Sequence, residues 1–156
     1  MSEERRKKII RWSLLFLWMI FIFFMSSQDG NKSTGQSNFV AELFEYFGFD
    51  IKSILGDIGT FIIRKTAHFC EYFILCVLFY RVLIMYFNIT RTRIISIVAT
   101  FIYASSDEIH QFFVPGRTCA FRDVLIDTLG GIVSILVLYI VLKLKDKKIK
   151  LEHKQK

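Results

Sequence analysis

The sequence predicts an all-α integral membrane protein with four transmembrane helices and short amphipathic helices in the first external loop. Two features of its 156 residues indicate this class. The hydrophobic fraction is 53% and the mean hydropathy is +0.42, whereas apolar residues make up about 45–50% of a typical soluble chain. The apolar residues are also gathered into four runs, each close to the roughly 20 residues with which a helix crosses a bilayer. This composition excludes a disordered tail, a disulfide-stapled secreted module and an ordinary soluble enzyme.

The four runs give expected spans at 9–26, 66–87, 94–113 and 123–142. Strands are not expected, because a lipid-facing strand alternates apolar with polar residues and these runs do not. The first run follows a basic segment, as in a secretory signal peptide. Its apolar part is longer than the usual h-region of about 7–15 residues, and no small-x-small cleavage site follows it. We therefore expect the first run to be retained as an anchor.

The lysine and arginine residues predict the orientation, because cationic loops favour the cytoplasmic side of a membrane. Five of them lie near the N-terminus, three at 81–93 and seven after residue 142, whereas six lie in the other loops. We therefore expect a basic N-terminus at 1–8 and a basic tail at 143–156, both cytoplasmic, on either side of a membrane domain at 9–142. This distribution accounts for the net charge of +7 without a nucleic-acid partner.

The first external loop, at 29–63, carries its own pattern. Its residues 31–37 are polar and turn-like. Apolar residues then recur at helical spacing over 39–47, before Gly48, and again over 51–62. Two short amphipathic helices lying on the outer membrane surface fit this pattern, and a lid packed over the helix bundle fits it equally well.

Polar side chains gather at the external ends of the expected spans. Ionisable groups within a membrane are costly, so they face the interior of a bundle and often mark function. Arg64, His68 and Glu71 share one face of the second span, and Asp107 and Gln111 share a face of the third. The substrate-binding residues that we expect at one extracytoplasmic pocket are Arg64, Lys65, His68, Glu71, Asp107, Glu108, His110, Gln111, Arg117, Asp123 and Asp127.

This cluster permits several interpretations. Ion pairs that hold the helices in register are the structural one. The i, i+3 pairs His68–Glu71 and Asp107–His110, with a carboxylate of the fourth span, have spacing that a metal site permits. No recognised zinc signature is present, so no metal is assigned and the cofactor is left open. A base, an acid and cationic clamps would serve an enzyme acting on a phosphate- or sugar-bearing lipid. A proton-coupled pathway is disfavoured, because the cytoplasmic halves of the spans carry no acidic or histidine residues.

Two smaller features are expected to have no catalytic role. Gly130 and Ser134, four residues apart, are typical of a close-packing seam between membrane helices. Cys70 and Cys76 are separated by about 9 Å of helical rise, too far to bond to each other. Cys119 is expected to be a free thiol in an external link.

Several segments together resemble the VanZ-like family. They are the exit of the first span at 26–28 and the motifs at 64–72, 103–111, 115–117 and 123–130. The resemblance covers about residues 10–140, essentially the whole membrane region. It implies a function in a bacterial cell envelope, because the family is named for a small membrane protein associated with low-level resistance to the glycopeptide teicoplanin. It implies no reaction chemistry.

The resemblance and the polar cluster lead to one hypothesis. Teicoplanin-type antibiotics carry an acyl chain and act at the outer face of the cytoplasmic membrane, where the cluster is expected to lie. The expected partners are membrane lipid, and a lipid-linked envelope precursor or a glycopeptide antibiotic bound by an outer-leaflet polar site. A membrane-embedded enzyme, metal-dependent or not, acting on such a lipid-linked substrate is the first alternative. A non-enzymatic scaffold is the second.

Overall fold

The computed structural model describes residues 2–49 and 56–154, and these residues form helices joined by short links. The helices are α1 (Glu3–Ser26), α2 (Gly30–Tyr46), α4 (Asp57–Leu83), α5 (Ile89–Phe112) and α6 (Phe121–Lys154). No strand occurs within the described ranges. The all-α class predicted from the sequence is therefore confirmed.

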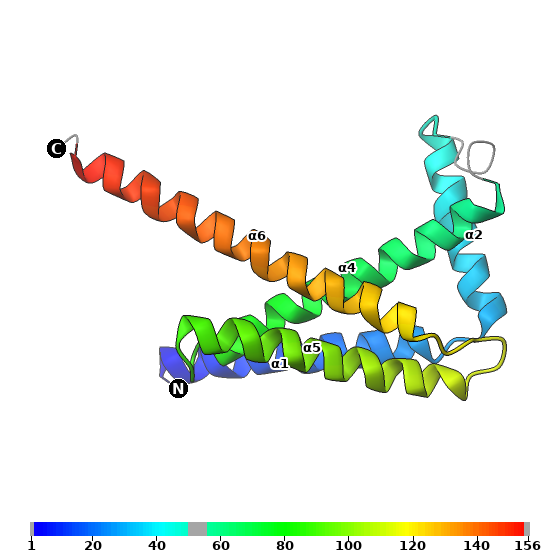
Figure 1. Cartoon of the computed structure of the whole chain (residues 1–156), viewed down its shortest axis with the longest axis horizontal. Coiled ribbons are helices and arrows are strands. Elements are labelled where there is room, and N and C mark those ends of the chain that lie inside the picture. Colours follow the sequence, from blue (N-terminus) through cyan, green and yellow to red (C-terminus); the bar gives the residue numbers. More distant parts are fainter. Residues whose placement is uncertain (1, 50–55, 155–156) are drawn as a thin grey trace.

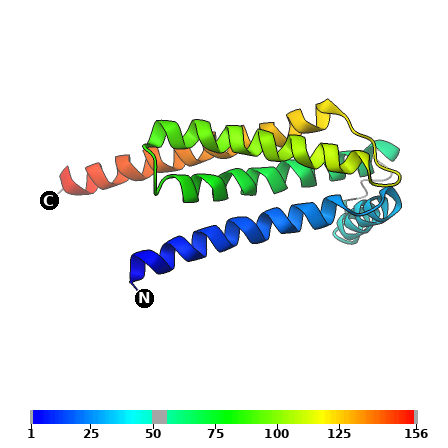
Figure 2. The same ribbon diagram turned by 90° about the horizontal axis from the view of Figure 1, so that it is seen from below.

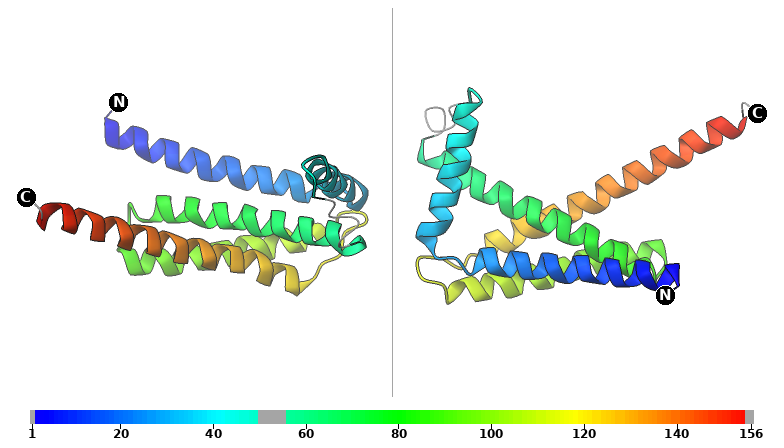
Figure 3. Two further views of the ribbon diagram at one scale, coloured as in Figure 1. Left: turned by 90° about the horizontal axis from the view of Figure 1, so that it is seen from above. Right: turned by 180° about the vertical axis from the view of Figure 1, so that it is seen from behind.

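Four long helices run back and forth, and α2 lies across one end of them (Figure 1). The two termini and the link between α4 and α5 lie at the end opposite α2. The link between α5 and α6 lies at the α2 end. Figures 2 and 3 show the same order, with α1 separated from α6 by the other helices. Helix α4 is central, because it packs against α1, α2, α5 and α6.

Glycines allow α4 and α6 to cross at close range. A Cβ atom on Gly130 would collide with the carbonyl oxygen of Phe69 on α4, and one on Gly131 would lie 3.0 Å from Cγ2 of Thr100. Ser134, one turn later, is completely buried. The predicted packing seam is thus present, and it brings the backbones of α4 and α6 together as small residues do in membrane helix pairs.

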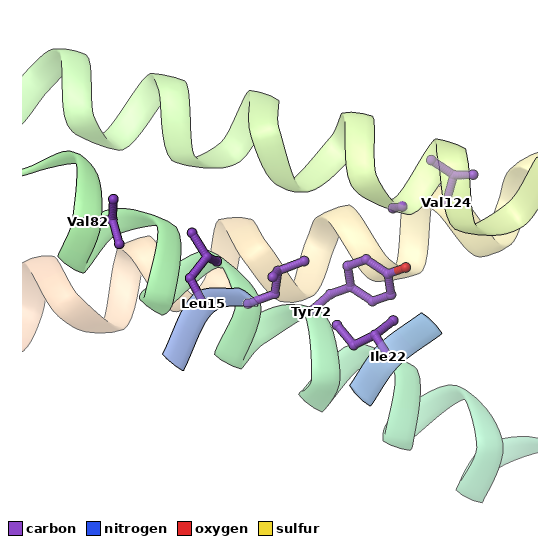
Figure 4. Packing of buried hydrophobic residues seen from close by; sticks show 7 residues of the cluster. Leu15, Ile22, Tyr72, Val82 and Val124 are labelled. Atoms are coloured by element: carbon purple, nitrogen blue, oxygen red, sulfur yellow. The ribbon is translucent and has the colours of Figure 1, made fainter. Parts of the chain in front are cut away.

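The apolar core lies on both sides of this crossing. One cluster joins Leu15 and Ile22 of α1 to Tyr72 and Val82 of α4 and to Val124 of α6 (Figure 4), and Ala104 of α5 also belongs to it. Many large apolar side chains instead point outward on α1 and α6. A continuous exposed apolar surface of this kind is not found on soluble monomers, and it is suited to lipid contact.

Helix α5 packs through small polar residues instead of large apolar ones. Thr92, Ser96, Thr100 and Ala104 recur every four residues and are all completely inaccessible. The Ser96 and Thr100 hydroxyls donate to carbonyl oxygens one turn earlier, at 2.7 and 2.9 Å. The hydroxyl stripe therefore satisfies its own hydrogen bonds and lets α5 approach its neighbours closely.

Three helices in the described ranges are long and apolar enough to cross a membrane: Glu3–Ser26, Ile58–Leu83 and Phe121–Lys150. They contain the expected spans 9–26 and 123–142 and, of the expected span 66–87, all but the last four residues. The third expected span, 94–113, is not among these helices but lies almost entirely within α5, whose 24 residues match α1 in length. Its polar stripe and its acidic end reduce its apolar character.

Several expected boundaries differ from the observed ones. Helix α4 begins at Asp57, nine residues before the expected start of the second span, and ends at Leu83. Helix α6 continues to Lys154, so much of the basic tail is helical. Of the second expected amphipathic helix, Ile51, Ile54 and Leu55 lie outside the described residues. Ile58 and Ile62 belong to the first turns of α4, because no break interrupts that helix after Asp57.

Candidate functional site

The predicted polar residues gather at the end of the bundle that carries α2. There the chain leaves α1, enters α2, begins α4, and turns from α5 into α6 through 113–120. The backbone N–H of Gly30 donates to the carbonyl of Pro115 at 3.1 Å. A Cβ on Gly30 would collide with the carbonyl oxygen of Gly116, which itself has a φ of +72°. Glycine at both positions lets the α5–α6 link lie directly against the start of α2.

Arg117 fastens the α5–α6 link to the end of α1. Its Nε donates to the carbonyl of Gln28 at 3.1 Å and its Nη2 to the carbonyl of Met25 at 3.4 Å. These carbonyls lie at a helix end, where backbone acceptors lack helical partners and cations are favoured. Burial, followed by repulsion from Arg64, lowers the pKa of Arg117. Arg64 and Arg117 line the same two cavities, so both guanidinium groups can act on one bound group.

A buried network joins α1 to α5 beneath this surface. The Ser26 hydroxyl donates to Asp107 Oδ2 at 2.9 Å, and the Gln111 side-chain amide donates to Ser26 Oγ at 2.6 Å and to Asp107 Oδ2 at 3.1 Å. All three side chains are buried. Asp107 is thus held by partners on two helices and lies below the surface of the site.

Two further carboxylates fix the start of α6. Glu108 Oε1 accepts from the backbone N–H of Ala120 at 2.6 Å. Lys65 Nζ lies 2.6 Å from Asp123 Oδ2, and both side chains are 17% exposed. These contacts support part of the structural interpretation, because they tie α4 and α5 to the beginning of α6.

A small polar cavity of about 60 Å³ lies among these groups. Eight of the eleven predicted site residues line it: Arg64, Lys65, His68, Glu108, Gln111, Arg117, Asp123 and Asp127. They come from α4, α5, α6 and the α5–α6 link. The predicted convergence of separate spans at one place is therefore seen for these eight.

A larger cavity of about 710 Å³ lies between α2, α4 and the end of α1. It shares Arg64, His68 and Arg117 with the small cavity, and Glu71 and Lys32 also line it. The remaining wall includes apolar side chains: Met25, Phe39, Val40, Ile63 and Ala67. The larger cavity therefore presents a cationic wall next to an apolar one.

The structure leaves His110 outside both cavities. Its ring stacks on Phe23 at a centroid distance of 4.5 Å, and its Nε2 lies 3.0 Å from the Ser27 hydroxyl. His110 follows Asp107 by three residues, so it lies on the flank of the helix face that Asp107 and Gln111 share. His110 therefore contacts α1 instead of the cavities.

Several buried polar atoms at the site have no hydrogen-bond partner among the described residues. They include Arg64 Nε, His68 Nδ1, Asp123 Oδ1 and Asp127 Oδ1. Buried polar groups are nearly always paired with protein or water. Unpaired donors and acceptors side by side indicate a place for a polar group from outside the chain.

The comparisons with known proteins identify one family. A family model described as VanZ/LLP1 matches residues 11–143, which is most of the chain. The chain belongs to the VanZ/LLP1 family. No curated protein and no solved structure matches it. The cavities of this VanZ/LLP1 protein lie wholly inside the matched region.

The VanZ/LLP1 site also contains residues that sequence reasoning did not select. Thr34 of α2 accepts a hydrogen bond from Arg64 Nη2 at 2.8 Å, and Gln36 donates to Gln28 at 2.8 Å. Lys32 lines the larger cavity. These residues lie in the stretch 31–37 that was read as turn-like, and its low apolar content gave no signal of a helix that packs on α4.

The metal interpretation gains no support from this VanZ/LLP1 structure. Within the described residues, no group of three or more histidine, cysteine or acidic side chains is placed to hold a metal ion. The three cysteines are free thiols, with Cys76 buried and Cys70 and Cys119 exposed.

Proposed function

We propose that this VanZ/LLP1 protein is a four-span protein of the bacterial cytoplasmic membrane whose extracytoplasmic site binds an anionic, lipid-linked component of the cell envelope. Both termini and the α4–α5 link lie in the cytoplasm in this proposal. The alternating directions of α1, α4, α5 and α6 support it (Figure 1), as does the concentration of cationic residues at the end opposite α2. The 24 residues of α5 extend about 36 Å, enough to cross a hydrocarbon core.

The larger cavity carries the functional part of the proposal. A lipid phosphate has an anionic head and an apolar tail, and this cavity offers complementary walls for both. Lys32, Arg64 and Arg117 supply charge-assisted donors for phosphate oxygens. Phe39 and Val40 of α2 offer apolar surface for the first methylene groups of the tail.

The guanidinium groups retain donors for a ligand. A guanidinium carries five N–H donors. The hydrogen bonds within the described residues use one donor of Arg64 and two of Arg117. Each arginine therefore holds its place in the protein and still offers N–H groups to a phosphate.

A binding measurement tests this function. Full-length protein in detergent is titrated with fluorescent phosphatidic acid, and with phosphatidylcholine as the zwitterionic comparison. We expect selective binding of phosphatidic acid, weakened roughly tenfold or more by Lys32→Gln and by Arg64→Gln, because a hydrogen bond to a charged group contributes about 1.5–3 kcal/mol. Arg91→Gln, on an exposed cation in the first turn of α5, is the matched control.

Two outcomes would contradict the proposal. One is equal binding of the two lipids, and the other is equal weakening by Arg91→Gln and Arg64→Gln. Teicoplanin is added as a competitor in the same assay. Displacement of phosphatidic acid by teicoplanin would support a shared site for acylated anionic envelope ligands.

A further inference from the structure

His68 lies in the wall that the two cavities share. Arg64 and Arg117 form that wall with it. A phosphoryl group held by the two arginines in the larger cavity is therefore next to the imidazole, and the small polar cavity adjoins the same three side chains. His68 is the sole imidazole on either cavity wall within the described residues.

Glu71 is placed to orient that imidazole. Its Oε2 lies 3.6 Å from His68 Nδ1, and the two side chains are 16% and 17% exposed. A carboxylate next to one ring nitrogen keeps the proton there and leaves the lone pair on the other nitrogen. The distance is longer than a hydrogen bond, and such contacts often shorten when substrate binds.

The charges of the larger cavity indicate the substrate class. Its three cations, Lys32, Arg64 and Arg117, match the charge of a diphosphate better than that of a single phosphodiester. Glu71 is the one carboxylate on that wall among the described residues, and it faces His68. The cavity thus supplies no separate acid to protonate an alkoxide. Cleavage of a phosphoanhydride needs no such acid, because its leaving group is a phosphate, which departs as a stable anion.

We propose that His68 is a nucleophile that removes the terminal phosphoryl group of a lipid diphosphate, an inference that rests on the lipid-binding function proposed above. Nε2 attacks the terminal phosphorus and forms an N–P bond. The anhydride P–O bond breaks, and its electron pair stays on the oxygen of the departing lipid monophosphate. Arg64 and Arg117 neutralise the phosphoryl oxygens during transfer.

The small cavity supplies the second half of the reaction. Its volume of about 60 Å³ corresponds to roughly two water molecules at about 30 Å³ each. Asp127 lines it, is only 4% exposed, and has a buried Oδ1 without a hydrogen-bond partner in the described structure. A water held there attacks the phosphorus and gives its proton to Asp127. The N–P electron pair returns to Nε2, and inorganic phosphate leaves.

The test uses full-length protein in detergent with farnesyl diphosphate labelled with ³²P at the terminal phosphate. Binding, phosphate release and acid-labile protein label are measured on the same samples. We expect the native protein to bind the probe, release phosphate and carry label. His68→Asn should bind but lose both label and release, whereas His110→Asn, the matched histidine control, should keep both.

Two further variants separate the half-reactions. Asp127→Asn should keep the label and release phosphate at least tenfold more slowly, so that labelled protein accumulates. Glu71→Gln should bind normally and acquire label at least tenfold more slowly, which a merely structural role would not produce.

The outcomes distinguish this inference from the proposed function. Binding of the probe by the native protein without label or phosphate release would overturn the nucleophile and leave lipid binding standing. Phosphate release by a His68→Asn protein that binds normally would also overturn it. Failure of the native protein to bind any lipid phosphate would instead overturn the proposed function itself.

Discussion

At the scale of single residues, Arg117 shows why structure and function overlap at this site. It donates to two carbonyls at the end of α1 and also lines both cavities. Its replacement would release the α5–α6 link as well as remove a ligand donor. Lys32 and Arg64 are better probes of binding, because they make fewer contacts that hold the backbone in place.

Ser26 is the residue through which Asp107 reaches α1. Ser26→Ala removes the 2.9 Å donor to Asp107 and the 2.6 Å acceptor of Gln111, so buried polar groups lose partners. We expect the free energy of unfolding in detergent to fall by about 1–3 kcal/mol. Ser105→Ala, which removes a hydroxyl bonded only within α5 at the carbonyl of Phe101, is the control. An equal loss in both variants would contradict the bridging role of Ser26.

Gly130 allows the closest approach of α4 and α6. In Gly130→Ala the new methyl group must displace the backbone at Phe69, and overpacking of this kind costs about 1–3 kcal/mol. We expect a lower thermal midpoint in detergent. Gly35→Ala, which adds a methyl with nothing within 4 Å, should leave the midpoint unchanged or raise it, because alanine favours helix more than glycine.

At the scale of elements, α2 does not pack through the large apolar residues that form its sequence pattern. Its buried residues are small, namely Ser33, Ser37 and Ala41, and they face inward at four-residue spacing. Tyr46 and the capping residue Phe47 are 84% and 68% exposed. The helix thus rests on α4 through small residues and directs the aromatic side chains at its C-terminal end outward, where a membrane interface would receive them.

This packing explains why the sequence predicted only the second half of α2. Apolar recurrence identified 39–47 and the stop near Gly48, whose φ is +90°. The first half, capped by Asp29 through the N–H of Lys32 at 2.8 Å, has Ser33 and Ser37 as its buried residues. Small polar residues look the same in a turn and in a close-packed helix, so the pattern did not reveal them.

The contact between Arg64 and Thr34 holds α2 on α4. Thr34→Ala removes the 2.8 Å hydrogen bond from Arg64 Nη2 and adds no bulk. We expect faster amide hydrogen exchange in 30–46 and unchanged exchange in the second half of α4, as for a local opening. Equal acceleration across the bundle would mean that α2 does not open on its own.

The candidate site was predictable to the extent that it depends on helix ends. Polar residues at the ends of three expected spans, and in the link between two of them, had to meet once the helices packed with alternating directions, and eight of these residues line the small cavity. The position of His110 depends on the rotation of α5, which spacing alone does not define. The larger cavity depends on how α2 packs on α4. The sequence motifs do not predict that packing, so they did not identify Lys32 and Thr34 as site residues.

At the scale of the whole molecule, four helices of alternating direction place both termini at one end (Figures 1 and 2). The membrane-spanning character of α5 is the point on which this topology depends. If α5 did not cross the membrane, the start of α1 and the end of α6 would lie on opposite sides of it.

Cysteine labelling in intact cells tests the topology. Cys119 is exposed in the α5–α6 link, and Asn88 lies in the α4–α5 link. In a Cys70→Ser background, we expect a membrane-impermeant maleimide to label Cys119 from outside. In a background that carries both Cys70→Ser and Cys119→Ser, Asn88→Cys should be labelled only after the cells are opened. Labelling of both positions from outside would contradict the four-span arrangement.

Tyr139 on α6 marks one end of an apolar stretch whose length can be compared with the thickness of a bilayer. The Arg93 guanidinium and the Lys143 ammonium lie 5.0 and 5.8 Å from the centre of its ring, a combination typical of a headgroup boundary. From Phe121 to Tyr139 the helix rises about 27 Å, close to the hydrophobic thickness of an average bilayer, about 30 Å. In the proposed topology, lipids with longer acyl chains would create a mismatch that the molecule would relieve by tilting or by drawing the end that carries α2 deeper. The acyl-chain length of the membrane would therefore determine how deeply the two cavities lie below the water boundary.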